Sequence, residues 1–525
     1  MSFDYVIVGA GSAGCVLASR LTEDPAVTVL LLEAGPPDTK REIKIPIAFS
    51  RLFLTEVDWQ YYTAPEPQLG DREIYWPRGK TLGGCSSINA MVYMRGNPLD
   101  YDEWERLGNE GWSWEDVLPY FKKAERNERG PSDLHGGAGP LNVADLRYVN
   151  PLTRAWLAAA EECGLPANAD FNGPAQEGVG LLQVTQKNGA RVSAADAYLR
   201  PVRRRRNLKV VTGAEVTKVV IEDGRATAVR YRTDGTTVSE TAGREVILSA
   251  GTVNSPKLLM LSGVGPGAHL AEHGISVVCE LPGVGQNLQD HLAIGLQYAS
   301  RLPVSLAAAD SRRELVRWLV QRRGMLTSTV MEGNGFVRSR PELPAPDLQL
   351  AFGPALYSGD PTETVKEHGF STGVFLLRPK SIGEIRLRSP DAGMDPVIRA
   401  NYLSDPGGED LRTVIWGLRL CRRIVAGRAF DPYRGDELMP GASVEDDREW
   451  ATHVRAEGTT IYHPVGTCKM GSDRMAVVDD ELRVHALKNL RVVDASIMPL
   501  IVRGNTNAPV IMIAEKAADL IRGRQ

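Results

Sequence analysis

The 525-residue sequence is poor in cysteine and in aromatic residues, and neither sign of charge predominates. Its six cysteines form no Cys-x-x-Cys pair, so we expect reduced thiols and predict neither a disulfide framework nor a metal site. The 61 basic and 65 acidic residues leave a net charge of −4, which argues against nucleic acid as a partner. The hydrophobic content of 43% is that of an ordinary globular protein.

Long apolar runs and an export signal are absent as well. No run of about 18 apolar residues occurs, so we expect no transmembrane helix. Residues 3–8 lead directly into a glycine-rich turn, without the basic segment and cleavage site of a signal peptide. These features predict a cytoplasmic protein, and they leave its oligomeric state and any peripheral membrane association open.

What the sequence does contain is an N-terminal β-α-β pattern of about 30 residues, the length of a nucleotide-binding unit. An apolar run at residues 5–8 precedes the glycine-rich turn, a helical pattern follows, and a second apolar run ends at Glu33. In such a unit Gly9 permits the tight turn, Gly11 lets a pyrophosphate approach the backbone, and Gly14 lets the helix pack on the strand. The acidic residue accepts hydrogen bonds from a ribose, and the helix start binds phosphate. The predicted dinucleotide site comprises Gly9, Gly11, Ser12, Ala13, Gly14, Glu33 and Ala34.

Only one such unit is found, because the other glycine clusters lack the full spacing and are typical of turns. The dinucleotide is therefore either NAD or FAD. Strand and helix patterns mix irregularly in the rest of the chain, which predicts an α/β fold mixed with α+β. A nucleotide domain would then be assembled from the start, the middle and the end of the chain. Strands are expected at 208–211, 216–221, 246–250, 348–352, 374–377, 383–387 and 490–493, and helices at 255–261, 312–323, 411–425 and 508–522.

Five ordered segments resemble motifs of the glucose–methanol–choline (GMC) flavoprotein oxidoreductases, and the choline-dehydrogenase-like branch is the most similar. They are residues 9–14 with Glu33, 78–96, 251–266, Tyr462-His-Pro-Val-Gly-Thr-Cys-Lys-Met-Gly471 and 493–499. The resemblance implies an α/β Rossmann-like FAD-binding domain and an α+β substrate domain, which is built on an antiparallel sheet with flanking helices. The FAD-binding domain is expected to span 1–157, 200–298 and 462–525, and the substrate-binding domain 158–199 and 299–461.

The resemblance also implies a reaction, the FAD-dependent oxidation of an alcohol to an aldehyde or ketone. The expected steps are proton abstraction and hydride transfer to flavin N5, with the flavin reoxidised by O2 or another acceptor. His463 stands at the position of the family's catalytic histidine, where an imidazole of near-neutral pKa can take the hydroxyl proton. Without that motif, a lone histidine would more often be structural. Structural or surface roles are expected for the other histidines, at 135, 269, 273, 291, 368, 453 and 485.

Asn507 is the expected partner of His463, since the family has His or Asn at its second active-site position. It would hold the substrate oxygen while His463 takes the proton. An alternative is that Asn507 caps the last helix, with Ala508 and Pro509 in the first turn. The two roles are compatible, and the sequence leaves both open.

The resemblance places further positions around the cofactor. The isoalloxazine and ribityl chain would be flanked by Cys85, Asn89, Ala90 and Val92, the adenine by the backbone of Val216, and the ribityl and phosphate region by Asp494, Ala495 and Pro509. For the two valines, ordinary core packing is the alternative. Ile88 occupies the position at which choline oxidases carry a histidine attached covalently to FAD. Isoleucine cannot form that bond, so we predict non-covalent FAD.

The substrate is less well defined by the sequence. Tyr462 is expected to form one wall of an aromatic pocket for an alcohol or a quaternary ammonium group. Glu332 matches an acidic residue that choline oxidases use for the trimethylammonium charge, but relatives without choline activity carry it too. Choline specificity is therefore not inferred.

Two other functions remain possible at this point. A flavin-containing hydroxynitrile lyase has the same fold and binds FAD without reducing it. An NAD-linked Rossmann dehydrogenase would use the same N-terminal glycine-rich unit. A serine or zinc hydrolase is disfavoured, because the sequence lacks both Gly-x-Ser-x-Gly and His-Glu-x-x-His.

Overall fold

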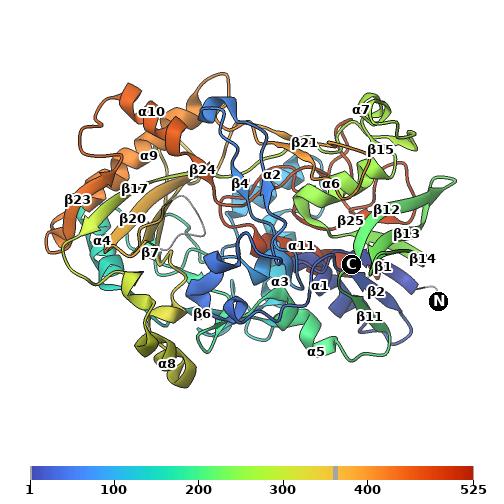
Figure 1. The fold of residues 1–525 in the computed structure, drawn as a ribbon, viewed down its shortest axis with the longest axis horizontal. Helices are drawn as coiled ribbons and strands as arrows, with labels where there is room; N and C mark the ends of the chain where they lie inside the picture. Colours follow the sequence, from blue (N-terminus) through green and yellow to red (C-terminus); the bar gives the residue numbers. More distant parts are fainter. Residues whose placement is uncertain (1–2, 359–364, 524–525) are drawn as a thin grey trace.

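The computed structural model describes residues 3–358 and 365–523, and these residues form two large sheets (Figure 1). The first sheet has a parallel core in the order β11, β2, β1, β14. The strands are β11 Leu208–Val211, β2 Val29–Leu32, β1 Phe3–Val8 and β14 Thr236–Leu248. β2 is buried throughout, as expected for a parallel strand that is covered on both faces.

Segments far apart in the sequence meet in this sheet. β12 Glu215–Glu222 and β13 Arg225–Thr233 extend β14 in antiparallel fashion, and β25 Leu490–Val492 pairs with β14 in parallel. α1 Ser12–Leu21 follows β1, and α11 Asn507–Ile521 packs against α1. The sheet and its helices are thus assembled from the start, the middle and the end of the chain, as the sequence patterns predicted.

The second sheet is antiparallel, in the order β23, β17, β20, β19, β18, β7, with β24 beside β17. Its strands are β23 Arg434–Met439, β17 Leu292–Ser300, β20 Gly369–Leu376, β19 Leu348–Gly353, β18 Gly333–Val337, β7 Gly178–Leu181 and β24 Thr459–Thr460. α4 Pro151–Glu162 and α9 Glu409–Val425 pack against this sheet, and α10 Asp447–Glu457 packs against α9. α9 begins with acidic and ends with basic side chains, an arrangement that complements the helix dipole.

Shorter elements connect the two sheets. Further described helices are α2 Pro98–Arg106, α3 Trp114–Ala124, α5 Arg200–Val202, α6 Gly251–Leu261, α7 Gly267–Glu272 and α8 Arg312–Gln321. Further described strands are β3 Tyr61–Tyr62, β4 Tyr75–Trp76, β5 Glu125–Asn127, β6 Leu141–Asp145, β8 Gln183–Val184, β9 Gln186–Lys187, β10 Ala190–Arg191, β15 Val264–Gly265, β16 Cys279–Glu280, β21 Glu384–Arg386 and β22 Val397–Arg399. The strands and helices predicted from the sequence are confirmed, and most ends differ by at most four residues, but β14 begins ten and β20 five residues earlier than predicted.

The predicted domain limits stay a prediction, and two of them fall inside single elements. α4 crosses the limit at 157/158, although its buried side chains belong to the core of the second sheet. β17 crosses the limit at 298/299 and also belongs to the second sheet. Residues 194–199, expected with the substrate domain, include side chains buried in the core of the first sheet. In the structure, α4 and β17 both belong to the second sheet and its core, so the predicted limits divide elements that pack together.

The predicted fold class is confirmed, because a Rossmann-like parallel sheet lies beside an antiparallel sheet with flanking helices. Within residues 3–358 and 365–523, no helix combines the length and the apolar character needed to cross a bilayer. The same residues contain no cluster of three or more His, Cys, Asp or Glu side chains suited to a metal ion.

Candidate active site

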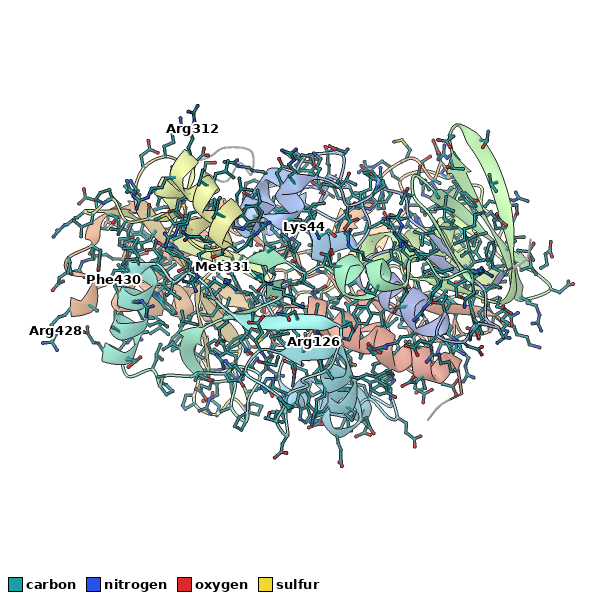
Figure 2. All side chains as sticks on the ribbon, turned by 90° about the horizontal axis from the view of Figure 1, so that it is seen from below. Lys44, Arg126, Arg312, Met331, Arg428 and Phe430 are labelled. Carbon is teal, nitrogen blue, oxygen red and sulfur yellow. The ribbon has the colours of Figure 1, made fainter. Side chains whose placement is uncertain are left out.

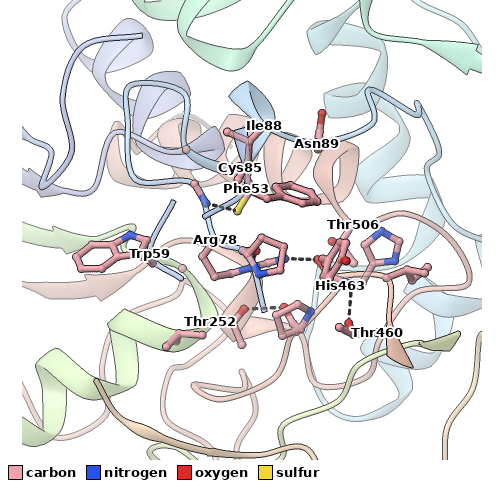
Figure 3. Close-up of a pocket in the computed structure, with 18 of the residues that line it drawn as sticks. Phe53, Trp59, Arg78, Cys85, Ile88, Asn89, Thr252, Thr460, His463 and Thr506 are labelled. Carbon is pink, nitrogen blue, oxygen red and sulfur yellow. Dashed lines mark hydrogen bonds between the residues drawn. The ribbon is translucent and has the colours of Figure 1, made fainter. Parts of the chain in front are cut away.

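A cavity of about 920 Å³ is lined by residues from both sheets (Figure 3). The first sheet contributes the glycine-rich turn, the end of β2 and the start of α11, and the second contributes parts of β17, β19 and β20. The predicted site residues that line it are Gly9, Gly11, Ser12, Ala13, Glu33, Ala34, Cys85, Asn89, Ala90, Val92, Val216, Tyr462, His463, Asp494, Ala495 and Asn507. Three predicted residues, Gly14, Glu332 and Pro509, lie outside this lining.

The glycine-rich turn has the conformation that its glycines permit. Gly9 has φ +98°, and a Cβ at this position would lie 2.5 Å from the Ser249 carbonyl oxygen. A Cβ on Gly14 would lie 1.9 Å from the Gly9 oxygen, so Gly14 serves the contact between α1 and β1. The turn therefore brings the start of α1 to the edge of the cavity.

Glu33 connects the turn to the end of β2. Its side chain is buried, and its two carboxylate oxygens accept hydrogen bonds from the backbone N–H groups of Ala10 and Gly35, each at 2.9 Å. Burial raises the pKa of Glu33 to about 7, although these two hydrogen bonds act in the opposite direction. Glu33 thus fixes the shape of the turn as well as lining the cavity.

A loop of residues 77–92 closes over the turn from the other side. Gly84 approaches so closely that a Cβ on it would lie 2.7 Å from Gly11 Cα. Asn89 accepts a hydrogen bond from the buried Arg191 at 2.8 Å, which holds the loop in place. Ile88 is buried and lines the cavity next to Cys85 and Asn89 (Figure 3).

Asp494 joins β25 to the start of α6. One of its oxygens accepts hydrogen bonds from the Gly251 N–H at 2.8 Å and the Ser255 hydroxyl at 2.6 Å. Burial raises the pKa of Asp494. Val216 is largely buried, so it combines the core role and the cavity position that the sequence left open.

His463 is held in the cavity wall by hydrogen bonds that other residues form with its backbone and with the backbone of Tyr462. The His463 N–H donates to Asp290 Oδ1 at 2.8 Å, and Asp290 also accepts from Thr460 and Tyr402, both at 2.5 Å. Tyr462 has φ +70°, and its carbonyl accepts from Arg78 at 2.6 Å (Figure 3). This unusual backbone conformation for a tyrosine turns the two adjacent side chains toward the cavity.

The asparagine that contacts His463 directly is Asn505, and the expected role of Asn507 as the partner of His463 stays a prediction. Asn505 Nδ2 lies 3.1 Å from His463 Nε2. Asn507 instead accepts a hydrogen bond from the Ser12 hydroxyl at 2.7 Å, and so links α11 to α1. Nor does Asn507 cap α11, because the N-cap residue is Thr506 and no side-chain cap bond forms. Both asparagines line the cavity, but their side chains contact different neighbours.

His291, expected in a structural or surface role, packs directly against His463. The two Nδ1 atoms are 3.0 Å apart, and the rings meet edge to face. An amide nitrogen can only donate, so Asn505 makes His463 Nε2 an acceptor, and His463 Nδ1 then donates to His291. The signal that would have revealed His291 is the polar Asp290-His291 pair immediately before the apolar run of β17.

The electrostatics of this pair favour neutral imidazoles. Burial lowers the pKa of His463 well below its usual value, and the nearby His291 and Arg78 lower it further. Burial also lowers the pKa of His291 to about 3. His463 is therefore uncharged at neutral pH, with Nε2 available as a proton acceptor.

Glu332 does not reach the cavity. It is fully buried, and its carboxylate accepts hydrogen bonds from Ser328 at 2.6 Å and from the Thr153 hydroxyl and the Asn150 N–H, each at 2.7 Å. It therefore ties the start of α4 to the segment before β18. Tyr462 does line the cavity, and its ring meets Phe53 edge to face at 5.8 Å.

Comparison with known proteins places this arrangement in a family. Family models described as GMC oxidoreductase match residues 3–293 and residues 379–514. The chain belongs to the GMC oxidoreductase family. An alcohol dehydrogenase [acceptor] of Pseudomonas putida is 48% identical over 528 residues, which cover 99% of this chain and 95% of that protein. The mitochondrial choline dehydrogenase of Mus musculus is 47% identical over 536 residues, covering 99% and 89%.

Solved structures agree with this assignment. The crystal structure of pyridoxine 4-oxidase from Mesorbium loti superposes with a TM-score of 0.91 at 33% identity and covers 100% of both chains. As a GMC oxidoreductase with alcohol and choline dehydrogenase relatives, the protein is an FAD-dependent enzyme that acts on CH–OH donors. The predicted family and reaction are confirmed. The comparisons give no support to a hydroxynitrile lyase or an NAD-linked dehydrogenase.

The cavity of this GMC oxidoreductase has features that fit FAD. A Cβ on Gly11 would meet nothing nearer than Gly84 Cα at 4.0 Å, so a pyrophosphate can approach the backbone where α1 begins. Two lining residues also carry polar atoms without a partner among the described residues: Ser249 Oγ and Asn505 Oδ1 are buried and form no hydrogen bond. Such atoms need a ligand or water to satisfy them.

Proposed function

We propose that the enzyme oxidises an uncharged alcohol with an apolar carbon chain, and that His463 and Asn505 contact the hydroxyl group. The observation that carries this proposal is the 3.1 Å pairing of Asn505 Nδ2 with His463 Nε2 in the cavity wall. FAD, when bound, supplies the acceptor for the hydride from the carbinol carbon. The residues of the chain supply a base for the proton and a hydrogen bond to the oxygen.

The proton chemistry follows from the state of His463. An alcohol that enters between the two side chains would replace their mutual hydrogen bond, donate its proton to His463 Nε2 and accept a hydrogen bond from Asn505. His463 is neutral, and its backbone is fixed by Asp290, so the base is in the right protonation state and is positioned before substrate arrives.

We infer an apolar substrate from the side chains that line the end of the cavity at His463. One wall contains Met331, Phe375 and Ile461, which pack into one apolar cluster. Another contains Phe53 and Tyr462. Glu332, the acidic residue expected for a trimethylammonium group, is occupied by buried hydrogen bonds elsewhere. A cationic substrate would lose its hydration there without gaining that counter-charge.

A matched pair of substrates tests the proposal. Choline and 3,3-dimethyl-1-butanol have nearly the same shape and differ in the positive charge. Bleaching of the flavin band under argon should be faster with the neutral alcohol, because only choline pays a desolvation penalty. Faster bleaching by choline would overturn the apolar assignment. No bleaching by any alcohol would contradict the proposed contacts of His463 and Asn505.

We further propose that FAD is bound without a covalent link, because Ile88 lines the cavity at the position of the attached histidine of choline oxidases. Acid precipitation should then release the yellow chromophore into the supernatant. A pellet that stays yellow after washing would show that another side chain is attached to FAD.

The reaction partners are proposed to be a small-molecule alcohol and either O2 or another external acceptor, in the cytoplasmic location predicted from the sequence. Admitting air to the reduced enzyme distinguishes the acceptors. A rapid return of the oxidised flavin band identifies O2, whereas a slow return identifies a different physiological acceptor.

A further inference from the structure

α8 exposes an unusual amount of apolar surface. Leu315, Val316, Leu319 and Val320 are 43%, 58%, 56% and 76% exposed. The spacing i, i+1, i+4, i+5 places these four side chains on one face of the helix. Large apolar side chains that gather on one exposed face mark a contact surface, whereas single exposed ones are common.

The opposite face of α8 is firmly attached to the protein. The Trp318 indole N–H donates to the Gly189 carbonyl at 2.8 Å, and Glu314 accepts from the Met325 N–H at 2.8 Å. The Arg322 guanidinium lies 3.9 Å above the Trp318 ring. The apolar face is therefore the outer side of an anchored helix.

Positive charge surrounds the apolar face. Residues 310–323 contain five arginines, at 312, 313, 317, 322 and 323, and two carboxylates, at 310 and 314. Asp310 pairs with Arg51 at 3.5 Å, and Glu314 with Arg317 at 3.4 Å. Arg312 projects outward at the end of the helix (Figure 2). This local excess of positive charge stands out in a chain whose net charge is −4.

We propose that α8 docks the enzyme on the surface of an anionic lipid bilayer. The four apolar side chains would enter the headgroup region, and the arginines beside them would contact lipid phosphates. A second copy of the chain fits this surface less well. A symmetric dimer would bring the same five arginines face to face, and like charges repel.

The proposed docking surface is closely connected to the cavity. α8 leads through residues 325–327 to Val330 and Met331, which line the cavity. Thr329, just before them, donates to the Ala90 carbonyl in the loop that closes over the glycine-rich turn. Trp318 packs in one apolar cluster with Ile45 and Ile47, which lie close in sequence to the lining residue Phe49. Docking through α8 would thus place the bilayer beside the wall of the active site.

Vesicle co-sedimentation of the FAD-loaded enzyme tests the proposal. Vesicles of phosphatidylcholine mixed with phosphatidylglycerol should bind the enzyme, vesicles of phosphatidylcholine alone should not, and added salt should weaken binding. The variant Leu319→Glu/Val320→Glu should bind the mixed vesicles at least about tenfold more weakly. Val277→Glu/Val278→Glu is the matched control, because these valines are 46% and 47% exposed outside α8, and its binding should be unchanged.

A second variant separates charge from apolar contact. Arg312→Gln/Arg323→Gln should weaken binding to mixed vesicles while keeping oxidation of the alcohol with a soluble acceptor unchanged, which also verifies folding. Absence of binding by the wild-type enzyme, or equal binding by the Leu319→Glu/Val320→Glu variant, would overturn the proposal. A wild-type dimer that becomes monomeric in that variant would identify a second copy as the occupant instead.

Discussion

The two ends of the cavity are built in different ways. At the nucleotide end, Glu33 accepts hydrogen bonds from the backbone of Ala10 and Gly35, which lie 23 and 2 positions away in the sequence. At the reaction end, His463 contacts Asn505 and His291, which lie 42 and 172 positions away. One end thus depends on backbone groups within a single β-α-β unit, and the other on side chains that only the complete fold brings together.

This contrast has a chemical consequence. Backbone N–H groups at a glycine-rich turn can hold a phosphate regardless of the alcohol being oxidised. Side chains at the reaction end set the protonation state and the polarity around the hydroxyl group. Substitutions at the nucleotide end should therefore change FAD affinity, and substitutions at the reaction end should change the rate of alcohol oxidation.

The largest effect is expected for His463→Ala. Loss of the base should slow anaerobic flavin reduction by about 10²- to 10⁴-fold, while FAD stays bound. Stopped-flow absorbance gives the rate, and the flavin-to-protein absorbance ratio gives the occupancy. An unchanged rate would show that His463 is not the base. Loss of FAD would show that the reaction end also determines FAD binding.

Asn505→Ala and Asn507→Ala form a matched pair. Removing Asn505 should slow flavin reduction by about 10²–10³-fold, as found for donors to a developing oxyanion. Removing Asn507 breaks a neutral hydrogen bond to Ser12 and should cost less than about tenfold. The reverse order of effects in stopped-flow reduction would identify Asn507 as the partner of His463.

At the nucleotide end, Glu33→Ala should weaken FAD binding by about 10- to 100-fold, because two backbone N–H groups of the turn lose their hydrogen-bond acceptor. Titration of the apoenzyme with FAD, followed by flavin fluorescence, measures the change. Glu73→Ala is the control, since this exposed carboxylate also lines the cavity. The reduction rate of FAD-saturated Glu33→Ala should stay close to that of the wild type, and a collapse of that rate would contradict the division of roles.

The smallest effect is expected from His291→Asn, measured as stability against pH. Folding lowers the pKa of His291 from 6.5 to about 3, so below pH 6.5 the unfolded state binds the additional proton. His291 therefore makes the protein less stable as the pH falls through 6.5. Between pH about 7.5 and about 5.5, the free energy of unfolding should drop by about 1 kcal/mol more in the wild type than in the variant. Equal drops in urea unfolding would show that His291 is not held neutral.

The sequence motifs located most of the cavity correctly but missed specific contacts. The Tyr462-His463 motif identified a residue of the cavity wall, whereas the family position at Asn507 gave no sign that Asn505 contacts His463. The turn before α11 directs these two side chains differently, and no sequence periodicity describes such a turn. Glu332 was expected near the substrate because it matches an acidic residue of choline oxidases, whereas its hydrogen-bond partners at the start of α4 lie 182 and 179 positions away.

The N-terminal β-α-β unit, the strands and helices, and the family were determined by the sequence itself, because each depends on local spacing or on the order of motifs. The tertiary structure alone decided the neighbours of His463, the exclusion of Glu332 from the cavity, and the exposure of the apolar face of α8. These features are set by backbone turns and by contacts between distant segments. Only the folded chain, in which hydrogen bonding and burial are satisfied together, determines which side chains meet.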